Sequence, residues 1–168
     1  DMTKHFTIVG GGQSGLQLGI GLLKAGHAVR IVQNRTGEEI EKGKVLSSQC
    51  MFDAALQNER DLGINFWEAE CPTVDSINFT VPAPDAPGVK AIDWNGKLDS
   101  YAQSVDQRLK IPRWMKEFTR LGGDMVIHDA SLDDLETYAK ESDLVIVAAG
   151  KGDIAKMFER DAERSPYD

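Results

Sequence analysis

A glycine-rich turn follows the first apolar segment of the chain. Its sequence, GGGQSG over residues 10–15, satisfies the spacing G-x-G-x-x-G. Where such a turn joins a strand to a helix, the backbone can approach a pyrophosphate, and the free N–H groups and dipole of the helix face the phosphate charge. We therefore predict that the phosphates of a dinucleotide are bound by Gly10, Gly12, Gln13, Ser14 and Gly15.

Three of the glycines have separate predicted roles. Gly10 allows the tight turn, and Gly12 leaves room for the phosphates because it has no side chain. Gly15 lets the helix lie against the strand, and Ser14 adds a hydroxyl donor. An ordinary loop between a strand and a helix is the alternative, but the three flanking elements of a β-α-β unit are all present in the sequence.

These flanking elements follow from the apolar pattern. Residues 5–9 (HFTIV) predict a short buried strand, and residues 28–32 predict a second one. Leu16, Ile20 and Leu23 recur at helical spacing, so residues 13–25 predict a helix. Further leucines at positions 18 and 22 widen its apolar face, which predicts that this helix is largely buried.

The second strand ends without the acidic residue that usually binds the ribose hydroxyls. Gln33 occupies that position and can still form a hydrogen bond to a ribose, without charge. Arg35 follows shortly after. The pair is compatible with a weakly held FAD, with NADP whose 2′-phosphate meets Arg35, or with an Arg35 that is simply a solvated loop residue.

The middle of the chain predicts a different layer. Residues 36–44 are charged and turn-like, and residues 48–62 predict a helix. Residues 77–81 and 89–94 both alternate polar and apolar side chains around a proline-rich connector, which predicts an antiparallel pair with one solvated face.

Alternation of helices and strands returns in the last third. Residues 107–121 predict a helix that begins after Asp106, and Pro112 either kinks it or opens a separate helix. Strands are predicted at residues 125–127 and 144–148, and between them Ser131-Leu132-Asp133-Asp134 resembles a capping box that begins a helix extending to residue 140.

This order of elements predicts an α/β, Rossmann-like dinucleotide-binding fold with a parallel central sheet. One domain, or a portion of one, covers residues 1–168, and a helix and an antiparallel β-hairpin are inserted at about residues 36–103.

Composition excludes several other classes. The net charge is -8 and the basic residues are scattered, so neither nucleic acid nor an anionic membrane is an expected partner. The first strand begins so early that it leaves no room for a signal peptide, and Cys50 and Cys71 do not form a CxxC pair. These features indicate a cytoplasmic protein. The three histidines, His5, His27 and His128, suggest no metal site.

Several segments together resemble the styrene and indole monooxygenase family, the FAD-dependent oxygenase component of two-part epoxidases. They are the glycine turn with residues 16–19 (LQLG), residues 104–112 (SVDQRLKIP), and residues 143–151 (DLVIVAAGK) with the FER and SP that follow at 158–160 and 165–166. That family also tends to lack the ribose acid, which agrees with Gln33.

The resemblance implies a cofactor and a reaction. FAD, reduced by a separate NADH-dependent flavin reductase, would form a flavin hydroperoxide and transfer an oxygen atom to a small aromatic alkene or an indole. The flavin supplies this chemistry, so no side chain is required as catalytic acid, base or nucleophile. The resemblance leaves room for a homodimer. Family members continue well beyond the matched segments, so the substrate domain is expected to be largely absent from this chain.

The resemblance also adds cofactor-binding residues outside the turn. It places Arg35 near the adenosine, Arg108 near a phosphate or the flavin, and Ala130 near the adenine. Ser47 and Ser48 are expected near the cofactor, and Gly150 is expected where a strand ends at the ligand-binding edge of the sheet. Two alternatives stay open: an NADP-dependent oxidoreductase domain and a non-catalytic nucleotide-binding fragment.

Overall fold

The computed structural model describes residues 2–46 and 49–165. The chain divides into two compact units, which are described separately. The first contains the residues up to Val45 and those from Gln107 onward, and the second contains Leu46–Asp106. Ser47 and Ser48, two of the predicted cofactor-binding residues, lie outside the described residues.

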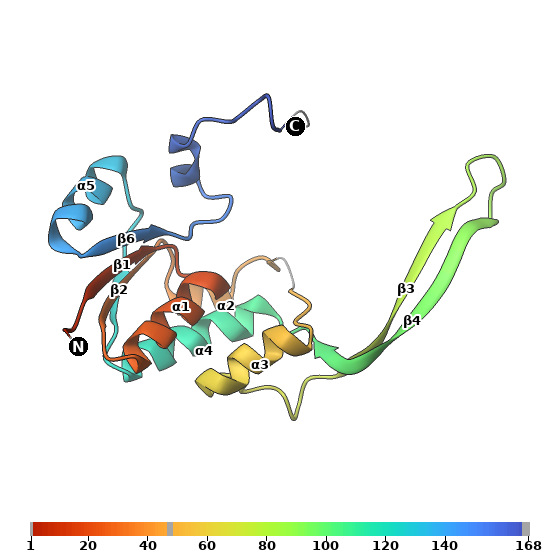
Figure 1. Ribbon diagram of the computed structural model, residues 1–168, viewed down its shortest axis with the longest axis horizontal. Coiled ribbons are helices and arrows are strands. Elements are labelled where there is room, and N and C mark those ends of the chain that lie inside the picture. Colours follow the sequence, from red (N-terminus) through yellow and green to blue (C-terminus); the bar gives the residue numbers. More distant parts are fainter. Residues whose placement is uncertain (1, 47–48, 166–168) are drawn as a thin grey trace. The chain divides into compact units, whose positions relative to one another are not determined.

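The first unit is built on a four-stranded parallel sheet. Strand β1 (His5–Val9) lies between β2 (Ala28–Gln33) and β6 (Leu144–Val147), and β5 (Asp124–Ile127) pairs with the other side of β2. Helices α1 (Gln13–Lys24) and α4 (Gln107–Arg120) lie on one side of this sheet, and α5 (Leu132–Glu141) lies on the other (Figure 1). The predicted α/β fold with a parallel central sheet is therefore confirmed.

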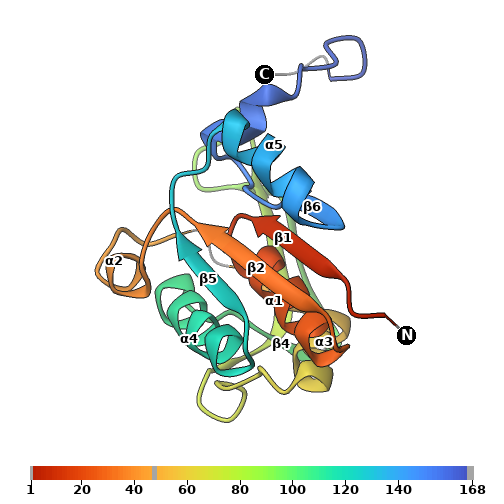
Figure 2. The same ribbon diagram turned by 90° about the vertical axis from the view of Figure 1, so that its left-hand side faces the viewer.

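The core of this unit lies between the sheet and the α1–α4 layer, and Figure 2 shows the order of its strands. Ile8, Ile20, Ile31, Trp114 and Phe118 have no accessible surface. Helix α1 buries only one stripe of its side chains. Leu16 is buried, whereas Leu18 is 41% exposed. The prediction that α1 is largely buried is wrong, because the sheet and α4 together cover only part of its surface.

One other local prediction needs correction, and the alternatives left open at Pro112 are decided. The segment predicted as a charged turn contains a short helix, α2 (Gly37–Glu41), because Thr36 and Glu39 form a reciprocal capping box. Helix α4 continues through Pro112, so that residue does not open a separate helix. The capping box predicted before α5 is present, with Ser131 and Asp134 as its two members.

The second unit contains helix α3 (Asp53–Leu62) and a long hairpin of β3 (Thr73–Pro82) and β4 (Lys90–Gln103). Helix α3 begins later than predicted, after Phe52. The helix ends at Gly63, which adopts the left-handed conformation (φ 66°) typical of a helix C-terminus. A 3-10 helix, η1 (Asp153–Met157), follows β6 in the first unit.

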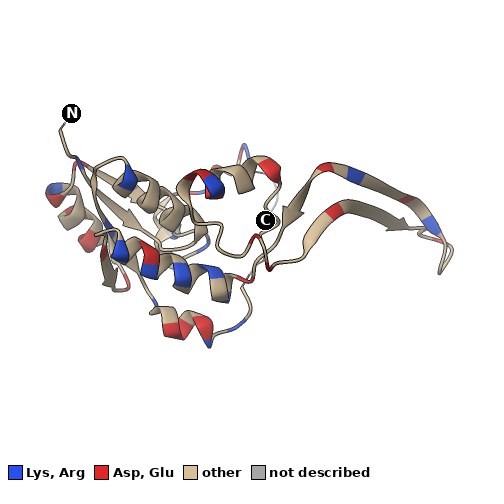
Figure 3. Cartoon of the chain, turned by 90° about the horizontal axis from the view of Figure 1, so that it is seen from below, with Lys and Arg blue, Asp and Glu red and all other residues tan. Residues whose placement is uncertain are grey.

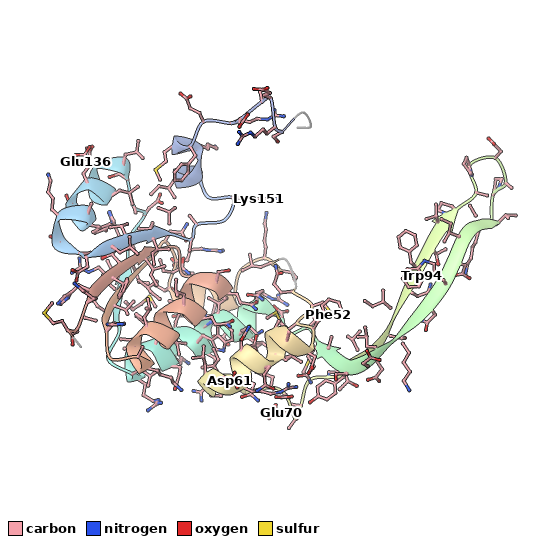
Figure 4. All side chains as sticks on the ribbon, viewed as in Figure 1. Phe52, Asp61, Glu70, Trp94, Glu136 and Lys151 are labelled. Carbon is pink, nitrogen blue, oxygen red and sulfur yellow. The ribbon has the colours of Figure 1, made fainter. Side chains whose placement is uncertain are left out.

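The hairpin exposes both of its faces. Phe79 and Trp94 are paired across the strands and stack with ring centroids 5.7 Å apart, yet they are 47% and 52% exposed. Figure 4 shows Trp94 on the hairpin, away from its connection to the rest of the unit. The prediction of an antiparallel pair is confirmed, but the expectation that only one face is solvated is wrong within the described residues.

A hydrogen-bonded network ties α3 to β4 in this unit. Arg60 donates from Nε (2.8 Å) and Nη2 (2.5 Å) to Oε1 of Glu68, and the Tyr101 hydroxyl donates to the same oxygen at 2.6 Å. Asn65 donates to the other carboxylate oxygen at 2.5 Å. The Arg60 guanidinium, then the Tyr101 and Asn65 donors, lower the pKa of Glu68 to about 2. Four donors therefore hold one carboxylate.

This network predicts a pH-dependent effect of Glu68→Gln. Because the pKa of Glu68 is lowered in the folded state, its stabilisation is present above the usual value of 4.5 and is lost as the pH falls through about 2. We expect Glu68→Gln to lower the free energy of unfolding by about 1 kcal/mol near neutral pH. In urea titrations, the difference in the free energy of unfolding between Glu68→Gln and the unmodified chain should disappear as the pH falls towards about 2.

A matched control is Glu70→Gln, which removes the same charge from an exposed carboxylate nearby (Figure 4). The side chain of Glu70 makes no hydrogen bond within residues 2–46 and 49–165. Its loss should change stability much less. A pH-independent effect of Glu68→Gln would contradict the role given to the ionised carboxylate.

Candidate functional site

The glycine turn lies at the carboxyl edge of the parallel sheet, between β1 and α1. Both neighbours of β1 hold the backbone where the turn begins, one at Gly10 and the other at the Val9 carbonyl. The Gly10 N–H donates to the Val32 carbonyl of β2 at 2.9 Å, and the Ala148 N–H, just after β6, donates to Val9 at 2.7 Å. The chain after β1 proceeds to β2 and β5 on one side and then crosses to β6 on the other. The turn therefore lies at the switch point where open α/β sheets bind ligands.

Gly10 is required by this position for two reasons. Its φ of +116° is in the region that side chains rarely adopt. A Cβ on Gly10 would also overlap the backbone carbonyl of Ala148. Any other residue would force β1 and the segment after β6 apart.

Gly12 faces open space in front of α1. It is exposed, it occupies the N-cap position, and a Cβ placed on it would meet nothing within 4 Å. No side chain caps α1, and no acidic residue lies in its first turn. The first N–H groups of a helix have no acceptor within the helix, so this end of α1 is arranged to receive an anion.

Close packing explains the last glycines of the motif. A Cβ on Gly15 would overlap the Gly10 carbonyl, and one on Gly19 would lie 2.8 Å from Cδ1 of Ile31. Helix α1 can therefore approach the turn and the sheet only because both positions lack side chains, which agrees with the packing role predicted for Gly15.

The first residues of α1 and α4 lie next to each other. Nε2 of Gln107, a residue that is only 6% exposed, donates to Oε1 of Gln13 at 2.8 Å. Arg108 is half-buried in the same first turn of α4. Neither first turn contains an acidic residue, and Figure 3 shows basic residues along α4 and acidic ones on α2. The positive ends of two helices thus meet beside the glycine turn.

Gln33, the last residue of β2, is 8% exposed and points at the turn. Its Nε2 donates to the Gly11 carbonyl at 2.7 Å, and its Oε1 accepts from the Asn34 N–H at 3.0 Å. The side chain lies where an acidic ribose ligand would stand, but both ends of its amide bind protein backbone.

Arg35 follows two residues later and is half-buried. Within residues 2–46 and 49–165 its guanidinium has no hydrogen-bond or ion-pair partner. The unpaired charge near the end of β2 is available to a phosphate.

The remaining predicted residues lie in loops of the same unit. Ala130 is half-buried in the segment between β5 and α5, where the neighbouring His128 N–H donates to the Gln33 carbonyl at 2.9 Å. Gly150 is exposed in the turn after β6 and has a φ of +58°. Thus the loops after β1, β2, β5 and β6 all leave from one edge of the sheet.

Two residues that contribute to this edge were missed by the sequence prediction. Gly11 occupies the unspecified position of the motif, but a Cβ there would lie 2.8 Å from Nε2 of Gln33. Gln107 belongs to the segment that resembles the monooxygenases. A glycine at the unspecified position between Gly10 and Gly12 was a signal for Gly11, whereas nothing in the sequence indicates the contact between Gln107 and Gln13.

A hollow of about 500 Å³ lies at the opposite, amino edge of the sheet. Its lining includes Arg30, which forms ion pairs with Asp124 and Glu141, both at 2.9 Å. The one cation in this cluster is thus already paired with two carboxylates, and the hollow is separated from the glycine turn by the length of the strands. No helix of the described chain is long and apolar enough to cross a bilayer.

Comparison with curated proteins finds similarity over nearly the whole chain. Styrene monooxygenase StyA of Pseudomonas fluorescens is 29% identical over 167 residues, which are 99% of this chain and 39% of the relative. A StyA from Pseudomonas sp. matches with the same identity and coverage. The predicted resemblance to styrene monooxygenases is confirmed, and the chain spans about two fifths of the length of these relatives. No protein-family profile matches it.

Solved structures share the fold at lower identity. The flavin-dependent halogenase CmlS has a TM-score of 0.60 and 17% identity, covering 79% of this chain and 24% of its own. The flavin-dependent brominase Bmp2 has a TM-score of 0.57 and 16% identity, with 75% and 29% covered. The flavin-dependent monooxygenase PieE, solved in complex with FAD and substrate, has a TM-score of 0.52 and 18% identity, with 75% and 24% covered. At these identities the likeness concerns the fold.

The contact between Gly10 and Ala148 predicts that Gly10→Ala is unusually costly. Strain at positive φ costs about 1–2 kcal/mol, and overlap with a backbone carbonyl adds about 1–3 kcal/mol. Gly122→Ala is the matched control, because Gly122 has a φ of +92° and open space around its Cβ position. Urea unfolding should show a clearly larger loss for Gly10→Ala. Equal losses would mean that the turn can move away from Ala148.

Proposed function

We propose that this chain is the FAD-binding part of a flavin-dependent monooxygenase. The observation that carries the proposal is the similarity to styrene monooxygenases over 99% of the chain. The structure of the chain adds a glycine turn at the switch point of a parallel sheet, where Gly12 faces open space in front of a helix that no side chain caps. These features suit the pyrophosphate of a dinucleotide. Residues 1–168 form one FAD-binding portion, into which residues at about 36–103 are inserted.

The residues have distinct roles in this proposal. Backbone N–H groups of residues 12–15 bind the pyrophosphate, and the adjoining ends of α1 and α4 stabilise its charge. Arg35 and Arg108 are positioned as additional cations, Ala130 lies near the adenine, and Gly150 borders the cofactor at the end of β6. Ser47 and Ser48 belong to the same proposed set. No side chain of this chain acts as an acid, base or nucleophile.

FAD, when reduced and bound, supplies activation of dioxygen and transfer of one oxygen atom. By analogy with the styrene monooxygenases, the whole protein epoxidises a small aromatic alkene or an indole in the cytoplasm. A separate NADH-dependent flavin reductase delivers the reduced FAD, and the oxygenase assembles as a homodimer. The protein part positions the flavin and excludes water from it.

Flavin titration tests the cofactor assignment directly. The purified chain, and any longer protein of which it is a part, should each quench the fluorescence of oxidised FAD on binding, and should bind reduced FAD under anaerobic conditions. Gly12→Val should lower the affinity at least about tenfold, since its side chain fills the space of the phosphates. Because that space is open in the fold, the melting temperature should change little. If neither protein binds FAD in either redox state, the proposed function is wrong.

A second candidate, an NADP-dependent oxidoreductase domain, is favoured by the unpaired guanidinium of Arg35. If Arg35 binds a 2′-phosphate, Arg35→Ala should weaken NADPH binding by about ten- to hundredfold, as expected for a charged hydrogen bond. Lys44→Ala removes an exposed charge nearby and serves as the control. Calorimetric titration that detects no NADPH binding by the unmodified chain would eliminate this candidate.

A non-catalytic nucleotide-binding role is the third candidate, since the chain spans 39% of its relatives. Oxygenation of indole by the 168-residue chain, supplied with NADH and a flavin reductase, would exclude it. FAD binding without oxygenation by the chain, together with oxygenation by a longer protein that contains it, would assign the substrate site to the remaining part of that protein.

A further inference from the structure

The Gln33 side chain is fixed in one orientation by the backbone around it. The Gly11 carbonyl can accept a hydrogen bond only from the amide NH2 of Gln33. The Asn34 N–H can donate only to the amide oxygen of Gln33. A flipped amide would place oxygen against oxygen and NH2 against N–H. The roles of the two ends are therefore determined by their partners.

Packing makes Gln33 and Gly11 mutually dependent. A Cβ on Gly11 would lie 2.8 Å from Nε2 of Gln33 and 3.1 Å from its Cβ. The main chain of β2 also holds Gly10, the residue before Gly11, because the Val32 carbonyl accepts a hydrogen bond from the Gly10 N–H at 2.9 Å. The last two residues of β2 thus hold the first two glycines of the turn, one through its backbone and one through its side chain.

We propose that Gln33 is a positioning residue that clamps the glycine turn through the Gly11 carbonyl and is not a ribose ligand. This proposal rests on the proposed dinucleotide site and changes the role predicted for Gln33. The clamp holds the backbone that leads into Gly12, the position that faces open space in front of α1. It acts on the cofactor only through the shape of the turn.

The clamp also accounts for the absence of an acid at this position. A glutamate in the same conformation would accept from the Asn34 N–H with one oxygen. Its second oxygen would face the Gly11 carbonyl, which Nε2 now approaches to 2.7 Å, without a proton between them. Two buried acceptors in contact repel each other, so an ionised acid is incompatible with this turn.

The two roles predict opposite effects of Gln33→Glu on FAD binding. A ribose ligand should bind as well or better when it becomes an acid, because that is the usual residue at this position. A clamp should fail, and we expect FAD affinity to fall about tenfold near pH 8, in proportion to one lost buried hydrogen bond. Fluorescence titration of FAD with the purified chain measures the difference.

The pH dependence separates a clamp from general damage to the fold. A protonated glutamate can again donate to the Gly11 carbonyl, so lowering the pH to about 5 should restore much of the FAD affinity of Gln33→Glu. Gln33→Met has a similar volume but no donor, and its affinity relative to the unmodified chain should not change with pH. A parallel pH response in both variants, or none in either, would overturn the proposal.

Unfolding measurements test the clamp without any ligand. Burial and the facing carbonyl should raise the pKa of the introduced carboxyl group in the folded state. The stability of Gln33→Glu relative to Gln33→Met should then be highest below the pKa of this carboxyl group in the unfolded state. It should fall as the pH rises through the pKa in the folded state. If neither the unmodified chain nor a longer protein that contains it binds FAD, the proposed function fails, and this comparison still decides the clamp. If the unmodified chain binds FAD and Gln33→Glu binds at least as well near pH 8, only the clamp is wrong.

Discussion

The backbone contact between Gly10 and the segment after β6 is the constraint on which the candidate site depends. With no side chain at Gly10, the carbonyl of Ala148 can lie directly beside the turn. This closeness lets β1 pair with β6 on one side while its turn remains bound to Val32 of β2 on the other. The N-terminus of α1 is then directed along the carboxyl edge of the sheet, where four loops leave together.

Much of this fold could be predicted because its signals are local. The mainly apolar runs of β1, β2 and β6 are typical of strands in a parallel sheet, and the spacing of Leu16 and Ile20 marks the buried stripe of α1. The short helix α2 was missed because its five residues are too few to show a periodic pattern. For the hairpin, alternation predicted the strands but could not reveal that Phe79 and Trp94 are exposed.

The candidate site, too, could be predicted from the sequence only in part. The glycines of the turn could be predicted, since each is required by backbone geometry that the spacing encodes. The contacts of Gln33 and Gln107 could not, because each joins residues far apart in the chain through the register of the sheet or the docking of two helices. Gln33 was predicted from the usual role of its position, whereas the structure directs its amide at the protein backbone.

An amide that binds the turn leaves the adenosine ribose without a charged protein anchor from β2. On the proposed function, the cofactor is then held mainly through its pyrophosphate, by helix dipoles and by cations such as Arg35, and such interactions weaken as the salt concentration rises. A cofactor that a separate reductase delivers in reduced form must be able to enter and leave the oxygenase. On these proposals, the missing acid and the clamped turn are two aspects of one arrangement, which favours exchange of FAD over permanent attachment.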